Sequence, residues 1–119
     1  MRKKMNKDDN FLDLIPTING SQQWDVLDDG LIQVIIPRDG IIDKAVRFFF
    51  KTPKVMKIDL DSLGSSVWKA IDGKRNMEEI AQIIKKEFGE NANPLYERLG
   101  TYINILRNNK FITLEKVSD

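Results

Sequence analysis

Cysteine and histidine are both absent from this chain of 119 residues. Without them, disulfide bonds cannot form, and no metal site can use thiolate or imidazole ligands. Ser-His and Cys-His nucleophile pairs are excluded for the same reason, as is the imidazole that most often moves protons near neutral pH. The Asp and Glu residues are scattered, not clustered as in a carboxylate metal site or an acid/base pair. We therefore expect a protein that is not an enzyme and that needs neither a metal nor another cofactor.

Long apolar runs and a strong net charge are also missing. No segment has the length and apolar character of a membrane span, and the basic N-terminus lacks the apolar core of a signal peptide. The 19 Lys and Arg residues nearly balance the 18 Asp and Glu residues, and the resulting net charge of +1 disfavours nucleic acid as a partner. We expect a soluble, cytoplasmic protein, a monomer or weak homodimer, that binds neither membranes nor nucleic acid.

The length and the pattern of the chain predict one domain behind an N-terminal arm. A chain of this length can bury one modest core. Residues 1–21 mix charges of both signs with turn-forming residues, so we expect them to be a mobile or loosely docked arm. Residues 22–116 carry regular apolar patterns and form the predicted domain.

A β-hairpin is predicted at the start of the domain. Apolar residues at 22–27 and 31–36 flank the turn sequence Asp28-Asp29-Gly30. The Phe-rich segment 40–53 that follows fits either a short helix or an irregular lobe. Residues 54–60 then have the length and alternation of a third strand, and their lysines suit an exposed sheet edge.

Two helices follow the third strand. In the first, Leu63, Val67 and Ile71 share one face, Trp68 beside them is expected to anchor the core, and Gly64 is expected to let the helix approach the sheet closely. This helix is predicted to be capped by Gly73. For the second helix, Asn76 and Glu79 form a capping-box pattern, and Gly89 marks the end.

A third helix and a terminal extended piece complete the pattern. Asn93 and Pro94 are predicted to be the N-cap and the first helical residue. The apolar stripe of this helix consists of Leu95, Leu99, Tyr102, Ile103 and Leu106. Residues 111–115 are predicted to be extended, packed on the core or paired with a strand.

This order of elements predicts an α+β, winged-helix-like fold, with a three-stranded antiparallel sheet followed by three helices. Domains of this kind bind either DNA or peptides, and the fold alone does not choose between them. In a winged-helix transcription regulator the third helix would read DNA bases. Arg107, Lys110 and the basic N-terminus favour that alternative, whereas Glu97 and the near-neutral charge disfavour it. The residues that would face the bases are Glu97, Arg98, Thr101, Asn104 and Asn108.

Four short segments occur in a characteristic order: Ile58-Asp59-Leu60-Asp61, Leu63-Gly64-Ser65 with Val67-Trp68, Ile71-Asp72-Gly73-Lys74-Arg75, and Glu78-Glu79-Ile80. With these segments, and with the late helix leading to Phe111-Ile112, the chain from Trp24 to Lys116 resembles the PqqD-like family. Members of this family are the peptide-recognition elements of pathways that modify ribosomally made peptides. The Phe-rich segment 40–53 departs from the shortest members.

The resemblance implies a non-catalytic function: recognition of the leader segment of a precursor peptide, which is presented to a modifying enzyme such as a radical-SAM or other maturase. In such proteins the leader adds a β-strand to the third strand, and the third helix forms the other wall of the groove. Without the resemblance, a covered sheet edge is the favoured interpretation of the strand, and Tyr102 and Ile105 can equally be extra core residues. On this chain the implied edge residues are Val55, Met56, Lys57, Ile58, Asp59 and Leu60. The implied wall residues are Arg98, Tyr102 and Ile105, with Arg98 placed to meet an acidic leader residue.

Overall fold

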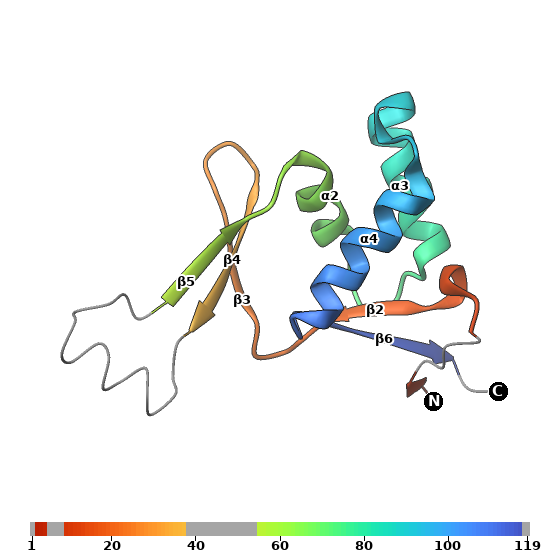
Figure 1. Ribbon diagram of the computed structural model, residues 1–119, viewed down its shortest axis with the longest axis horizontal. Helices are drawn as coiled ribbons and strands as arrows, with labels where there is room; N and C mark the ends of the chain where they lie inside the picture. The colour runs from red at the N-terminus through yellow and green to blue at the C-terminus, as the bar shows by residue number, and fades with distance from the viewer. Residues whose placement is uncertain (1, 5–8, 38–54, 118–119) are drawn as a thin grey trace.

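The computed structural model describes residues 2–4, 9–37 and 55–117, and within these it contains two three-stranded antiparallel sheets and three α-helices (Figure 1). The predicted α+β class, with three helices after a three-stranded antiparallel sheet, is confirmed. The predicted helix or lobe in the Phe-rich segment 40–53 lies outside the described residues. In chain order the elements are β1 (Arg2–Lys4), the 3-10 helix η1 (Phe11–Asp13), β2 (Ile15–Ile18), β3 (Gln23–Val26), β4 (Ile32–Pro37), β5 (Val55–Asp59), α2 (Ser62–Ala70), α3 (Met77–Phe88), the 3-10 helix η2 (Gly89–Ala92), α4 (Leu95–Asn108) and β6 (Ile112–Val117).

The first sheet has the order β3-β4-β5 and contains the predicted hairpin and third strand. At the hairpin turn, the Leu27 N–H donates to the Leu31 C=O at 2.8 Å, and the Gly30 N–H donates to the Leu27 C=O at 2.8 Å. Gly30 has a φ of 85°, which glycine adopts at little cost. The turn therefore forms where the Asp-Asp-Gly sequence predicts it.

Helix α2 begins after the two residues that follow β5, Leu60 and Asp61. The Asp61 side chain is its N-cap and accepts a hydrogen bond from the Gly64 N–H at 2.8 Å, which satisfies one of the free amides of the first turn. The helix ends at Ala70, with Ile71 as its C-cap. Gly73, predicted to be the cap, instead lies in the following turn with a φ of 77°.

The capping box of α3 is present as predicted. The Glu79 N–H donates to Asn76 Oδ1 at 2.9 Å, and the Asn76 N–H donates to Glu79 Oε1 at 3.1 Å. At the other end Gly89 caps the helix with a φ of 57°. Local sequence signals therefore define both ends of this helix.

The start of α4 differs from the prediction by one residue. Its N-cap is Pro94, and the first helical residue is Leu95. Asn93, predicted to be the N-cap, instead caps η2, since its N–H donates to the Glu90 C=O at 3.1 Å. The short 3-10 helix between α3 and α4 displaces the predicted start.

The second sheet has the order β1-β6-β2, and it differs from the predicted mobile or loosely docked arm at the residues of β1 and β2, which are paired strands. β2 pairs antiparallel with β6 from Ile15, opposite Glu115, to Ile18, opposite Ile112. Leu14 just before it is buried, with an exposed fraction of 1%. The terminal extended piece, β6, is the partner that holds this segment against the core.

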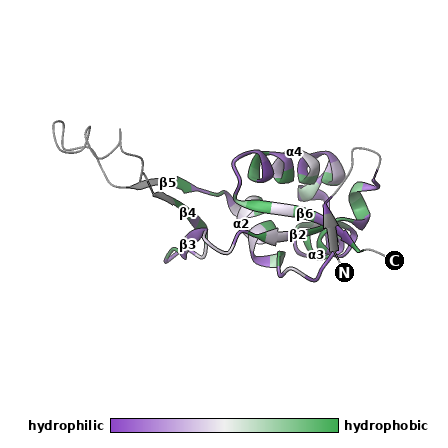
Figure 2. Cartoon of the chain, turned by 90° about the horizontal axis from the view of Figure 1, so that it is seen from below, coloured by the Kyte–Doolittle hydropathy of each residue, from purple (hydrophilic) through white to green (hydrophobic). Residues whose placement is uncertain are grey.

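The core lies between the helices and the second sheet and includes Ile32 and Val34 of the hairpin sheet. Trp68 is 1% exposed, as expected of a core anchor, and its ring meets that of Trp24 edge to face, with centroids 5.6 Å apart. The hairpin sheet extends to one side of the helices and of the second sheet (Figure 2). Other fully buried side chains include Leu14, Ile32, Val34, Val67, Met77, Ile80, Ile84, Leu99, Ile103, Leu106 and Ile112.

Candidate functional site

Strand β5 forms one edge of the hairpin sheet. β4 pairs with one side of it, and among the described residues no strand pairs with the other side. An edge strand of this kind carries main-chain N–H and C=O groups that a further strand can bind. Its outer side is therefore the first candidate for a binding surface.

The register shows which main-chain groups of β5 face outward. The Leu60 N–H donates to the Ile32 C=O at 2.8 Å, so this pair is a hydrogen-bonded one. Hydrogen-bonded and non-hydrogen-bonded pairs alternate along an antiparallel ladder. Ile58, two residues before Leu60, must therefore direct its N–H and C=O toward β4. Lys57 and Asp59 direct theirs to the open side.

An independent contact supports this assignment. Lys57 is opposite Ile35, whose C=O accepts a hydrogen bond from the Gln22 side chain at 2.8 Å. Gln22 precedes β3, on the side of β4 away from β5. The main-chain groups of Ile35 are therefore turned away from Lys57, as the alternation requires.

The buried hydroxyl of Ser65 in α2 makes the last hydrogen bonds between β4 and the residue after β5. It accepts a hydrogen bond from the Ile32 N–H at 2.8 Å and donates to the Leu60 C=O at 3.2 Å. Both main-chain groups of Leu60 are therefore bonded inside the domain, and its side chain is 7% exposed. The open edge runs from Val55 to Asp59 and does not include Leu60.

The side chains of β5 alternate between the two faces of the sheet. Ile58 pairs with Val34, which pairs with Trp24, so these three residues share a face, and Ile58 is 36% exposed on it. Lys57 and Asp59 lie on the opposite face. There the Gln33 side chain donates to Asp59 Oδ1 at 2.7 Å. Strand β5 therefore offers an apolar side chain on one face and charged ones on the other.

Tyr102 on α4 contacts the start of α2, directly after β5. Its hydroxyl donates to Asp61 Oδ1 at 2.8 Å, the same oxygen that caps α2. A Cβ atom added to Gly64 would overlap the Tyr102 ring, so the missing side chain of Gly64 makes room for that ring. The expected role of Gly64, close approach of helix to sheet, is thus corrected: it allows a side chain of α4 to pack on α2.

The environment of Tyr102 keeps its hydroxyl protonated. Partial burial, together with the hydrogen bond to Asp61, raises its pKa from 10.0 to about 12. A protonated hydroxyl can continue to donate to the carboxylate across the physiological pH range. The Tyr102 contact is therefore a stable link between α4 and the residue that follows the open edge by two positions.

A hollow of about 360 Å³ lies beside this link and is lined by Asp61, Pro94, Glu97, Arg98, Thr101 and Tyr102. Its charge is mixed, because the two carboxylates stand with one guanidinium. Arg98 also donates to the Asn91 C=O at 2.8 Å, which fixes one end of its side chain. The hollow can therefore bind either a cationic or an anionic group.

The structure brings together only part of the implied site. Arg98 and Tyr102 line the hollow near the end of β5, whereas Ile105 is not among its lining residues and is 53% exposed further along α4. In Figure 1, α2 lies between β5 and α4. Val55 and Met56 complete the edge strand, opposite Pro37 and Ile36.

Asp61 belongs to the segment Ile58-Asp59-Leu60-Asp61, but the sequence did not indicate that it is part of this surface. Its position before Ser62 is typical of an N-cap, but no local pattern indicates that it also accepts from Tyr102, 41 residues away. Within the described ranges no group of three or more acidic side chains could hold a metal ion, and no helix there is long and apolar enough to cross a membrane.

The chain matches the model of a known protein family. The family model described as "Coenzyme PQQ synthesis protein D (PqqD)" matches residues 53–112, half of the chain. The matched range begins just before β5 and ends at the first residue of β6, so it includes the open edge, α2, α3 and α4. No curated protein and no solved structure matches the chain.

Proposed function

The chain belongs to the family of coenzyme PQQ synthesis protein D (PqqD), and we propose that it recognises the leader segment of a ribosomally synthesised precursor peptide. In this proposal the domain catalyses no reaction and needs no cofactor. It acts in the cytoplasm and presents the bound peptide to a modifying enzyme, a radical-SAM or similar maturase.

The leader binds by strand addition to the outer side of β5. The N–H and C=O groups of Lys57 and Asp59 point to that side, and the peptide backbone supplies their partners. Main-chain pairing gives affinity that does not depend on peptide sequence. Alternate side chains of the peptide then lie beside Ile58 on one face of the sheet and beside the charged residues on the other.

Specificity comes from α4 and from the hollow at the end of the edge. Arg98 meets an acidic side chain of the leader, and the exposed Ile105 offers an apolar contact. Tyr102 holds α4 against the start of α2 by its hydrogen bond to Asp61, so its main role is to position the helix and not to contact the peptide. The observation that carries the proposal is the open edge of β5, which leads directly into the start of α2.

The DNA-binding alternative has less support. In that reading α4 is the recognition helix, and Arg98 on it would contact bases. Glu97 stands beside Arg98 in the hollow, where its carboxylate would repel nucleic-acid phosphates, and the net charge of +1 gives little attraction to them. Nucleic acid is therefore not part of the proposal.

Two proline variants on adjacent residues test the strand addition. Lys57→Pro removes an outward N–H, so it should leave the fold largely intact and abolish or strongly weaken leader binding. Ile58→Pro removes an N–H that belongs to the ladder with β4, so its main effect should be a lower Tm. Titration calorimetry with the leader of a precursor peptide encoded beside this protein measures the first effect, and thermal melts measure the second.

A matched alanine variant separates main-chain from side-chain effects at position 57. Lys57→Ala keeps the N–H, so it should bind the leader nearly as well as the parent. Arg98→Glu should weaken binding by roughly 1–3 kcal/mol if Arg98 is a central contact. A folded Lys57→Pro variant that binds the leader like Lys57→Ala would exclude the open edge of β5 as the site.

A further inference from the structure

A second open strand edge lies on the other sheet. β6 has β2 along one side from Ile112 to Glu115, but on its other side β1 pairs only with Glu115–Val117. Among the described residues no strand pairs with that other side of Ile112, Thr113 and Leu114. Within the described ranges, a strand therefore pairs with the first half of β6 on one side only.

The free side of this segment carries main-chain groups of two residues. The Asn19 N–H donates to the Phe111 C=O at 2.9 Å, so the pairing toward β2 is a hydrogen-bonded one at Phe111. By the alternation of an antiparallel ladder, Ile112 and Leu114 then direct their N–H and C=O groups away from β2. Pro16, opposite Leu114, agrees with this assignment because it has no N–H to donate.

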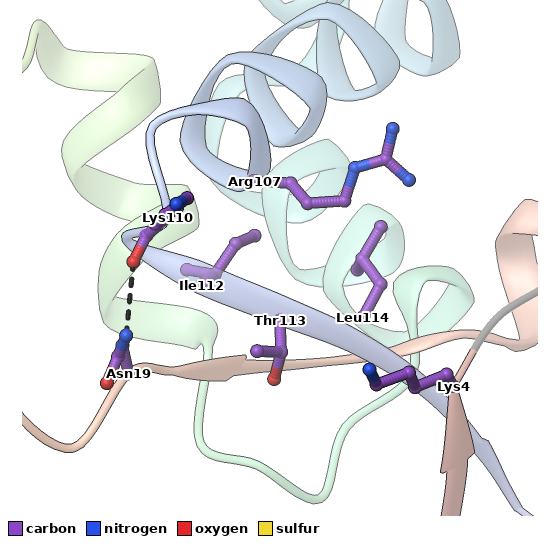
Figure 3. A pocket seen from close by; sticks show the side chains of 7 residues that line it. All are labelled: Lys4, Asn19, Arg107, Lys110, Ile112, Thr113 and Leu114. Carbon is purple, nitrogen blue, oxygen red and sulfur yellow. Dashed lines mark hydrogen bonds between the residues drawn. The ribbon is translucent and has the colours of Figure 1, made fainter.

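A cavity of about 440 Å³ lies along this free side (Figure 3). The side chains that line it come from β1, the turn after β2, α4, the turn after α4, and β6. Three of them are cationic, and no carboxylate is among them. The lining residues are Lys4, Asn19, Arg107, Lys110, Ile112, Thr113 and Leu114.

Several contacts define the border of the cavity. Lys110 has a φ of 64°, unusual for a residue other than glycine, and its C=O accepts a hydrogen bond from Asn19 Nδ2 at 3.3 Å, drawn as the dashed line in Figure 3. At the other end Glu115 is opposite Lys4, and its Oε1 accepts from Thr113 Oγ1 at 3.4 Å. Positive charge therefore dominates the lining, and one carboxylate stands at the border.

We propose that this cavity binds an acidic peptide segment in extended conformation. The main-chain groups of Ile112 and Leu114 pair with the peptide backbone, while acidic side chains of the peptide meet Lys4 and Lys110. This site is separate from the β5 edge, and it does not require that edge to bind a leader. The competing explanation is that the lysines protect an exposed edge from pairing.

A labelled synthetic peptide tests the proposal on the full chain. The probe is a short, end-capped peptide of alternating threonine and glutamate that carries fluorescein, and its binding is followed by fluorescence anisotropy. Lys110→Glu should weaken binding by roughly tenfold, the change expected when one of three cations near a charged ligand becomes an anion. Lys86→Glu, an equal change of charge on the exposed face of α3, is the matched control and should have a much smaller effect.

Two further probes separate pairing from charge. A peptide with glutamine in place of glutamate should bind more weakly, and a glutamate peptide N-methylated at alternate amides should lose affinity because it cannot pair with β6. In NMR spectra of the parent, the amide signals of Ile112 and Leu114 should shift on addition of the acidic probe.

Three results would overturn the proposal. The first is no binding of the acidic probe, which would leave edge protection as the role of the lysines. The second is a failed control: the Lys110 and Lys86 variants weaken binding of the acidic probe equally, or the N-methylated peptide binds as tightly as the unmodified one. The third is a set of shifted amides centred on Lys57 and Asp59, which would place the probe on β5.

Discussion

Replacement of Gly64 by alanine should destabilise the domain, although alanine favours helices. Gly64 lies inside α2 and is not among the glycines with positive φ, so an alanine can adopt its backbone conformation. The obstacle is tertiary, because the three atoms nearest to an added Cβ all belong to Tyr102. The ring must therefore leave its place on α2.

The magnitude follows from two opposing terms. Alanine in place of glycine inside a helix stabilises it by about 0.5–1 kcal/mol. Displacement of Tyr102 costs its hydrogen bond to the Asp61 carboxylate, about 1.5–3 kcal/mol for a charged partner, in addition to the buried contacts of the ring. We therefore expect a net loss of roughly 1–3 kcal/mol for Gly64→Ala, within the range measured when extra atoms are forced into a packed site.

A double-mutant cycle makes the reasoning testable. In a Tyr102→Ala background the obstacle is gone, so Gly64→Ala should become stabilising by about 0.5–1 kcal/mol. Urea denaturation of the parent, the two single variants and the double variant provides the free energies of unfolding. If Gly64→Ala destabilises both backgrounds equally, the ring of Tyr102 is not what excludes a side chain at position 64.

Two more predictions concern stability. Trp68→Ala should cost about 3–5 kcal/mol in denaturant melts, since Trp68 is fully buried and Trp24 would lose the ring that it contacts; a variant as stable as the parent would show that Trp68 does not anchor the core. The folded-state pKa of Tyr102, about 12, lies above its ordinary value of 10.0, so its contribution to stability should be complete below pH 10 and lost as the pH rises toward 12. Tyr102→Phe has no hydroxyl to titrate, so its stability should fall less across that range; an identical fall in both proteins would contradict the assignment.

Local patterns were enough to predict the hairpin, β5 and α3. A tight turn with Gly30 and a capping box at Asn76 depend on residues a few positions apart, and short-range chemistry determines both. The open edge of β5 could likewise be predicted, since the two lysines of the predicted strand 54–60 suit an unpaired strand. The resemblance to a known family then added the expectation that this edge binds a peptide.

The second sheet could not be predicted in the same way. β2 contains Pro16, which argues against a strand, and its partner β6 lies about a hundred residues further along the chain. Because Leu14 and Ile15 stand among charged and turn-forming residues, their burial depends on that distant pairing. The contacts of Tyr102 with Asp61 and Gly64 are also tertiary. The spacing of apolar residues in α4 therefore predicted which residues form a stripe, but not which residues they contact.

The Ser65 hydroxyl affects which main-chain groups of β5 a peptide would meet. A slip of one residue between β4 and β5 would turn Ile58 to the opposite face and exchange the inward and outward amides of the strand. Ser65 opposes such a slip, because its hydroxyl joins the Ile32 N–H to the Leu60 C=O and thereby keeps these two residues opposite each other. One side chain of α2 thus fixes the register of the strand that forms the open edge. The identity of the amides offered to a peptide is decided inside the domain, away from the surface on which the peptide would lie.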